Sequence, residues 1–167
     1  MASPTVFPYG PAAQGGSPDN ITGLAAGQAK VLGSVGIAAT PLYDVTIAPI
    51  QVMTGTGATG TIEAYLVCSE TPGATGNWEG NVNPTLATDQ SSLLPGLRRV
   101  QLVNVITSAG SYKFPEWSVA SVLGFMPMFF TVMIYNNTNA AFNATSTNFN
   151  AMYSIINYTS PPPIAYA

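Results

Sequence analysis

Charged residues are scarce in this chain. Four Lys and Arg and seven Asp and Glu give 11 charges among 167 residues, or 7% of the sequence, where an ordinary soluble domain has roughly 25%. The net charge is -3 and Arg98-Arg99 is the only basic pair, so the Lys and Arg cluster that binds nucleic acid is missing. With so few charges to keep copies apart, we expect the chain to self-associate and to have part of its surface covered.

Two further shortages exclude much chemistry. The chain has no His, which removes the commonest general base, the Ser-His-Asp and Cys-His systems, and the commonest zinc ligand. Cys68 is the single cysteine, so no disulfide forms within the chain and no Cys-rich metal site can be built. Because Cys68 lies in an apolar stretch, we expect a small core residue rather than a reactive thiol.

The carboxylates are the remaining candidates for catalysis or metal binding. Seven Asp and Glu are spread along the sequence, and they form no recognisable pair for glycoside hydrolysis and no calcium-binding cluster. We therefore expect a protein that is not an enzyme and that holds neither a metal ion nor a cofactor.

Residues 119–135 are the one stretch apolar enough to be considered for a membrane. The stretch is shorter than the roughly 20 residues of a spanning helix, it contains Gly124 and Pro127, and no Lys or Arg follows it. The sequence instead predicts a short turn or helix up to Leu123, a break around Gly124 and Pro127, and a buried strand from Met128. We expect no membrane partner.

Residues 1–27 are rich in Pro and Gly, a composition that does not hold regular structure. They predict an extended N-terminal arm, followed by one domain over residues 28–167. Val6, Phe7 and Tyr9 are unusual in such an arm, because disordered segments are depleted in aromatic side chains. Two alternatives are open: the arm folds back onto its own domain, or it lies across a neighbouring subunit.

From Gln28 onward, short apolar segments separated by Gly, Pro, Asn and Thr turns are typical of an all-β domain. We expect strands at residues 30–39, 42–52, 61–68, 99–107, 128–136 and 151–158. The strand 61–68 alternates most clearly, with Ile62, Ala64, Leu66 and Cys68 on the face that we expect to be core. Strands 99–107 and 128–136 are apolar on both faces, so we expect them to lie between two sheets or between subunits.

Two connections carry further hypotheses. The segment from Gly55 to Gly60 superficially imitates a phosphate-binding loop, but no Lys-Ser or Lys-Thr follows it, and we predict a hairpin turn. The stretch 70–95 is long for a connection in a compact domain, and such connections are usually functional or docked on something. Trp78 in this stretch either closes one end of the domain or anchors an interface, as Trp does at binding hot spots.

The C-terminal half carries a resemblance to a known family. Its order is Tyr112-Lys-Phe-Pro-Glu-Trp-Ser-Val-Ala120, then Gly124 and Pro127, an apolar strand ending in Tyr135-Asn-Asn-Thr138, and a last strand at Tyr153-Ser-Ile-Ile-Asn-Tyr158. In this order, residues 99–158 resemble the head decoration, or cement, proteins of tailed bacteriophages. The resemblance implies an antiparallel β-sandwich of jelly-roll type. It also implies homotrimers on the outer surface of the virion, where they bind the major capsid protein and stabilise the capsid.

We expect the contacts with such partners to come from aromatic, apolar and basic residues. The candidate interface residues are Val6, Phe7, Tyr9, Trp78, Arg98, Arg99, Phe129 and Tyr135. The alternative function is a receptor-binding or glycan-binding module of a phage tail or fibre, in which Trp78, Trp117 and tyrosines would stack on sugars. Trp117 is more easily explained as a core residue, because Val119 and Val122 follow it closely.

Overall fold

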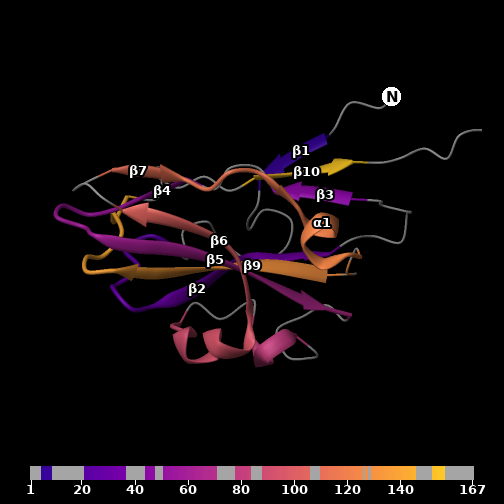
Figure 1. Cartoon of the computed structure of the whole chain (residues 1–167), viewed down its shortest axis with the longest axis horizontal. Helices are drawn as coiled ribbons and strands as arrows, with labels where there is room; N and C mark the ends of the chain where they lie inside the picture. The colour runs from indigo at the N-terminus through magenta and orange to yellow at the C-terminus, as the bar shows by residue number, and fades with distance from the viewer. Residues whose placement is uncertain are drawn as a thin grey trace, which may run out of the picture.

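The structure is a computed structural model that consists mainly of β-strands (Figure 1). It describes residues 5–8, 21–36, 44–47, 51–70, 78–83, 88–105, 110–125, 127, 129–145 and 152–156. The strands are β1 (Thr5–Pro8), β2 (Ala29–Gly36), β3 (Asp44–Ile47), β4 (Gln51–Met53), β5 (Gly60–Ser69), β6 (Arg98–Val105), β7 (Ser111–Lys113), β8 (Trp117–Ser118), β9 (Phe129–Thr138) and β10 (Met152–Ile156). The helical elements given for these residues are the 3-10 turns η2 (Glu79–Asn81) and η3 (Ser91–Gly96) and the short α-helix α1 (Val119–Leu123).

The described strands pair in a nested order. The first pairs with the last, β1 with β10, and the series continues inward with β2 and β9, β3 and β8, β4 and β7, and β5 and β6, each pair antiparallel. Pairing of β10 with β3 and of β5 with β9 then gives two four-stranded sheets, ordered β1-β10-β3-β8 and β2-β9-β5-β6, while β4 and β7 form a ribbon of their own. Every pair among the described strands is therefore antiparallel, and the expected all-β, antiparallel class is confirmed.

Most predicted strands lie close to their predicted positions. Strands β5, β6, β9 and β10 begin and end within two residues of the predicted bounds, and β2 begins one residue before its predicted start and ends three residues before its predicted end. The prediction of one strand over 42–52 was wrong, because this range contains β3 and β4, which belong to different sheets. Pro49 lies between the two strands, and proline has no amide proton to give to a sheet. The short strands β1, β7 and β8 were not predicted.

The prediction of a hairpin turn from Gly55 to Gly60 was also wrong. This segment joins β4 to β5, but β4 pairs with β7 while β5 pairs with β6 and β9. The segment passes from one sheet to another and lies against the turn that follows β9: the Gly55 amide donates to the Ala141 carbonyl at 3.0 Å. Gly60 has φ of +126°, and a side chain there would collide with the backbone oxygen of Asn137.

Strand β5 is buried on both of its faces. Ile62, Ala64, Leu66 and Cys68 lie in the larger core cluster, as predicted for the alternating strand. The opposite face is buried as well, and Tyr65 and Val67 belong to a second cluster together with residues of β2 and β9. We call this second side of the β2-β9-β5-β6 sheet its outer face.

The outer face is covered by the long connection between β5 and β6. Trp78 and Val82 are buried against it, and Leu93, Leu94 and Leu97 pack on the same cluster. Figure 1 shows η2 and η3 on the side of the sheet opposite to β1, β10 and β3. The apolar second face of β9 is therefore buried within the chain, and another subunit is not needed to cover it.

Polar anchors hold the connection in place. The Ala29 amide donates to Asp89 at 2.8 Å, and the Gln90 amide donates to the Ala29 carbonyl at 2.9 Å. Burial by itself raises the pKa of Asp89, but hydrogen bonds from the amides of Ala29 and Ser91, from the Ser91 hydroxyl, and the nearby charge of Lys30 hold it below its usual value. Asp89 is therefore ionised at neutral pH and ties the connection to the start of β2.

The apolar run 119–135 divides as the sequence predicts. Helix α1 begins after Ser118, whose hydroxyl accepts a hydrogen bond from the Ser121 amide at 2.9 Å, and ends at Gly124 in the left-handed conformation with φ of +81°. Strand β9 follows from Phe129. Among the described residues, no helix has the length and apolar character needed to cross a membrane.

Part of the N-terminal segment belongs to the fold itself. Strand β1 pairs with β10, with Val6 opposite Ser154 and Phe7 opposite Tyr153. Ile21 and Leu24, which the sequence analysis placed in the arm, are buried in the larger core cluster. The described parts of residues 1–27 therefore follow the first alternative, in which the segment packs on its own domain.

Candidate functional site

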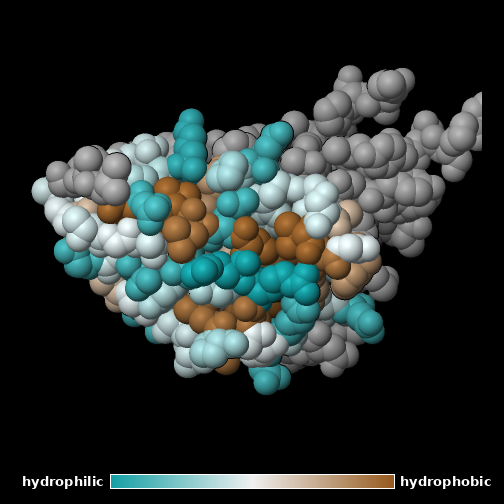
Figure 2. All heavy atoms as spheres, viewed as in Figure 1, coloured by the Kyte–Doolittle hydropathy of each residue, from teal (hydrophilic) through white to brown (hydrophobic). Residues whose placement is uncertain are grey.

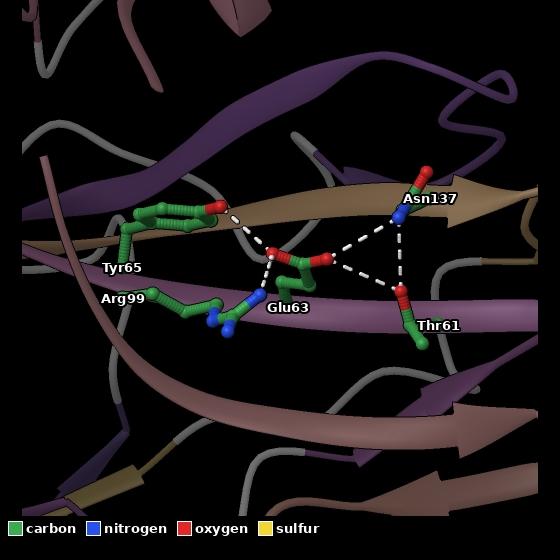
Figure 3. A network of polar contacts seen from close by, with 5 residues as sticks. All are labelled: Thr61, Glu63, Tyr65, Arg99 and Asn137. Carbon is green, nitrogen blue, oxygen red and sulfur yellow. Dashed lines mark hydrogen bonds and ion pairs between the residues drawn. The ribbon is translucent and has the colours of Figure 1, made fainter. Parts of the chain in front are cut away.

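Five polar side chains form a connected network on the outer face of β5 (Figure 3). Thr61, Glu63 and Tyr65 come from alternate positions of β5, and Arg99 and Asn137 reach them from the two neighbouring strands, β6 and β9. Side chains at alternate strand positions share a face, so β5 brings the first three together without any turn. Glu63 lies at the centre, and 7% of its side chain is exposed.

Each oxygen of Glu63 accepts two hydrogen bonds. Oε2 accepts from the Tyr65 hydroxyl at 2.7 Å and from Arg99 Nη1 at 3.2 Å. Oε1 accepts from the Thr61 hydroxyl at 3.2 Å and from Asn137 Nδ2 at 3.3 Å. Nδ2 of Asn137 also donates to the Thr61 hydroxyl at 3.1 Å, which closes the network.

These contacts fix the protonation states of the network. Burial alone raises the pKa of Glu63, but the four hydrogen bonds outweigh this effect and lower the pKa below its usual 4.5. Burial, the hydrogen bond to Glu63 and the negative charge of Glu63 together raise the pKa of Tyr65 to about 12. At neutral pH, Glu63 is therefore ionised and Tyr65 is neutral.

This arrangement suits a structural tie better than acid-base chemistry. A general base needs a pKa near the working pH and a free oxygen that can reach the substrate, whereas Glu63 has a lowered pKa and four donors around its two oxygens. Two groups of the network are exposed: Asn137, and Arg99, whose side chain is 52% exposed. The network thus joins β5, β6 and β9 and holds one guanidinium at the surface.

A register shift brings Arg99 into position. Strand β6 pairs regularly with β5 up to Gln101, opposite Ala64, and then Tyr65 lies opposite Arg99, so Val100 is the extra residue of a bulge. Without the shift, Val100 would lie opposite Tyr65 and Arg99 would change faces. Bulges commonly re-aim a side chain in this way, and here the bulge directs the guanidinium toward Glu63.

The eight candidate interface residues lie at different places in the fold. Val6 and Phe7 are in β1, and Tyr9 lies outside the described residues. Arg98 is exposed at the start of β6, where its Nη1 donates to the Val122 carbonyl at 2.9 Å. Arg99 belongs to the network around Glu63.

The other three candidate residues come together, but in a cluster within the chain. Trp78 is 3% exposed, and Phe129 and Tyr135 are partly buried against the same cluster on the outer face. Of the two alternatives for Trp78, the structure therefore supports the one in which it packs on its own domain. Trp117 is 7% exposed and lies in the larger core cluster, as expected.

The sequence analysis did not identify the network around Glu63. One signal was available: Thr61, Glu63 and Tyr65 share a strand face at alternate positions, and Arg99 begins the next predicted strand. Asn137 could not be found without the pairing of β5 with β9. The thiol of Cys68 is buried as expected, and burial followed by the negative charge of Glu79 raises its pKa to about 12.

Among the described residues, no group of three or more acidic or cysteine side chains is placed to hold a metal ion. No protein-family model matches the chain, and the search of curated proteins found no match.

Proposed function

We propose that this chain is a structural protein of a bacteriophage virion, which decorates the capsid as a homotrimer and stabilises it by binding the major capsid protein at the outer surface. The observation that carries the proposal is the order of the strands. The resemblance of residues 99–158 to decoration proteins gives the partner and the location.

The strand order fits a jelly-roll sandwich. A jelly roll arises when one antiparallel ribbon of eight strands is rolled up, so that the first strand pairs with the eighth, the second with the seventh, and so on. With the β4-β7 ribbon set aside, this chain has that order: β1 with β10, β2 with β9, β3 with β8 and β5 with β6. Trp117 of β8 shares the larger core cluster with Ile62 of β5 and Phe130 of β9, which supports packing of the two sheets against each other.

Jelly rolls occur in viral capsid proteins and also in lectins, so the exposure of aromatic rings bears on the choice between the two functions. Sugar-binding sites use exposed aromatic rings. Both tryptophans of this chain are buried, at 3% for Trp78 and 7% for Trp117. Their burial counts against the alternative function, a receptor-binding or glycan-binding module of a tail or fibre, which would have to use its tyrosines instead.

The surface suits many weak contacts better than one strong contact. Figure 2 shows small apolar patches interspersed with polar and weakly polar areas. Among the described residues, only Leu102 and Phe125 are large hydrophobic side chains with high exposure. A decoration protein gains from contacts that repeat at many copies, and trimer formation multiplies them further, so modest patches suffice.

The location of the chain on particles tests the proposal. We expect an antibody against this chain, labelled with gold, to mark the head of native particles in electron microscopy, and particles lacking the chain are the control. Label confined to the tail tip would contradict the decoration function and favour the alternative.

The mass of the purified chain tests the self-association. We expect light scattering at micromolar concentration to give the mass of a trimer or of a multiple of a trimer. A single species at 17.3 kDa would contradict a trimer that is stable away from the capsid.

A further inference from the structure

Strand β6 is an edge of the β2-β9-β5-β6 sheet. It pairs with β5 on one side and is the last strand in the described order. At 3.3 Å per residue, its eight residues present a row of backbone amides and carbonyls about 26 Å long. An exposed edge of this length is a template for a further strand.

The central part of this edge lacks the usual protection against pairing. Natural edge strands are blocked by charged side chains, by proline or by bulges. In β6 the two charges and the bulge lie at its beginning, at Arg98, Arg99 and Val100, and the residues that follow are Gln-Leu-Val-Asn-Val, without charge or proline. Among the described residues, no charged side chain of β6, no proline and no further strand therefore blocks pairing over residues 101–105.

Leu102 marks the middle of the open edge. It lies opposite Glu63 on β5, so its side chain points to the outer face of the sheet. Leu102 is 40% exposed, and Phe125, beyond α1, is the other large hydrophobic residue with comparable exposure among the described residues. Burial of Leu102 would remove apolar surface that the fold of one chain leaves in water.

The distribution of charge favours a second copy as the added strand, in the antiparallel direction. If Leu102 lies opposite Leu102 of the copy, Gln101 faces Val103 and Val100 faces Asn104, so every central pair is uncharged. The two Arg99 residues are then separated by six residue steps, or about 20 Å. Parallel pairing would instead place the arginines of the two copies about 5 Å apart, which is unfavourable.

We propose that β6 pairs with β6 of a second copy of this chain, antiparallel and with Leu102 opposite Leu102, which joins the two β2-β9-β5-β6 sheets into one continuous sheet. Register in a sheet follows the hydrophobic pattern, and this register places the two exposed leucines in contact. The contact has twofold symmetry, as an interface between identical patches requires. It is separate from the threefold contact of the proposed trimer and does not depend on the capsid function.

The variant Leu102→Lys tests the contact through the mass of the particle. It places two positive charges opposite each other at the centre of the ladder, where like charges oppose pairing. We expect light scattering over a concentration series to give half the wild-type mass, whether the wild type is a pair of monomers or a pair of trimers. The matched control is Phe125→Lys, which makes the same chemical change at an exposed residue outside the edge and should leave the mass unchanged.

A disulfide experiment tests the register. In the proposed register, cysteines introduced by Leu102→Cys lie directly opposite each other, with Cα atoms 4.5 to 5.5 Å apart, roughly the range that a disulfide spans. Cysteines introduced by Asn104→Cys lie about 13 Å apart and serve as the control. We expect mild oxidation to give a covalent dimer with Leu102→Cys and none with Asn104→Cys, on non-reducing gels.

Two results would overturn the proposal. One is a mass of Leu102→Lys equal to that of the wild type, with circular dichroism showing that the variant is folded. The other is cross-linking of Leu102→Cys no faster than that of Asn104→Cys. Because Leu102 is exposed and outside both core clusters, neither substitution should disturb the fold.

Discussion

Removal of one hydroxyl from the network around Glu63 gives a quantitative test of its role. In Tyr65→Phe the ring stays in the second cluster, but Glu63 Oε2 loses the 2.7 Å hydrogen bond from Tyr65. Hydrogen bonds to charged groups contribute about 1.5 to 3 kcal/mol to stability. Because Glu63 keeps three other donors, we expect a loss of about 1.5 to 2 kcal/mol at pH 7, toward the lower end of that range.

The pH dependence shows whether the lost bond was one to an ionised carboxylate. The folded pKa of Glu63 is lowered, so its contribution is fully present above its unfolded pKa of about 4.5 and disappears as the pH falls through the folded value. The difference between the wild type and Tyr65→Phe should therefore shrink below about pH 4.5, toward the roughly 1 kcal/mol of a bond between neutral groups.

Titration of Tyr65 changes stability in the opposite direction, because it removes stability as the pH rises. Its folded pKa is raised to about 12 from 10, so its contribution is fully present below pH 10 and disappears as the pH rises toward 12. A difference of about two pKa units corresponds to a free energy on the order of 3 kcal/mol. The wild type should therefore lose stability between pH 10 and 12 more steeply than Tyr65→Phe does.

Urea unfolding followed by circular dichroism at pH 3.5, 7 and 11 measures all three quantities. The control is Tyr135→Phe, which removes the hydroxyl of a partly buried tyrosine that lies opposite Glu63 on β9 but donates no hydrogen bond to it in the network. A loss for Tyr65→Phe below about 0.5 kcal/mol at pH 7, or a loss that is the same at pH 3.5, would refute the assignment of Glu63 as an ionised structural anchor.

Three further predictions concern the close contacts and the buried side chains. Gly60→Ala should lower the free energy of unfolding in urea by more than about 2 kcal/mol, because the added Cβ meets a backbone oxygen of β9. Gly57 has φ of +77° and free space around it, so Gly57→Ala should lose only the strain of the left-handed conformation, about 1 to 2 kcal/mol. Equal losses for the two variants would contradict the close approach at Gly60. The thiol of Cys68 is buried and has a pKa of about 12, so at pH 8 it should react with a thiol reagent far more slowly in the native chain than in urea. Complete labelling of the native chain within minutes would contradict its burial. Trp117→Phe should cost less free energy of unfolding than Trp78→Phe by about 1 kcal/mol, because the buried ring nitrogen of Trp117 has no hydrogen-bond partner among the described residues and its removal relieves an unpaired donor. A larger loss for Trp117→Phe would contradict this reason.

Alternation along a strand could be read from the sequence, but pairing could not. The pattern of Ile62, Ala64, Leu66 and Cys68 placed β5 and its core face correctly, because side chains alternate with a period of two whatever the partner strand is. The same pattern does not say which strands are neighbours. For this reason the segment from Gly55 to Gly60 was interpreted as a hairpin, although its flanking strands belong to different sheets.

The partner of an apolar face was also beyond the sequence. Strand β9 is apolar on both sides, and the sequence indicated only that both sides are covered. The cover of its outer face is the connection that carries Trp78 and Val82, a segment without periodicity whose docking depends on single anchors such as the hydrogen bond from the Ala29 amide to Asp89. Such anchors join positions 60 residues apart, so local patterns do not reveal them.

Some of the few charged side chains are engaged in hydrogen bonds within the fold. Glu63 and Asp89 are engaged by hydrogen bonds from neighbouring strands and from the backbone. Other polar ties use neutral amides, such as Asn136, whose Nδ2 donates to the carbonyls of Leu24 and Ala140. Of these two carboxylates Glu63 is withdrawn from the surface, whereas Asp89 is exposed but held by its hydrogen bonds.

A surface of this kind changes the energetics of association. Burial of a charge is unfavourable unless a partner replaces its water, whereas the backbone groups of an edge strand regain hydrogen bonds when a second strand is added. Formation of an interface at the uncharged part of β6 would thus remove little water from charged groups. The two Arg99 side chains would stay at the ends of the interface, in contact with solvent. Over the part of the chain that the structure describes, the shortage of charge does not produce a broadly apolar surface. It would lower the barrier to weak contacts between copies, such as the proposed pairing of β6, which gain strength when they are repeated many times.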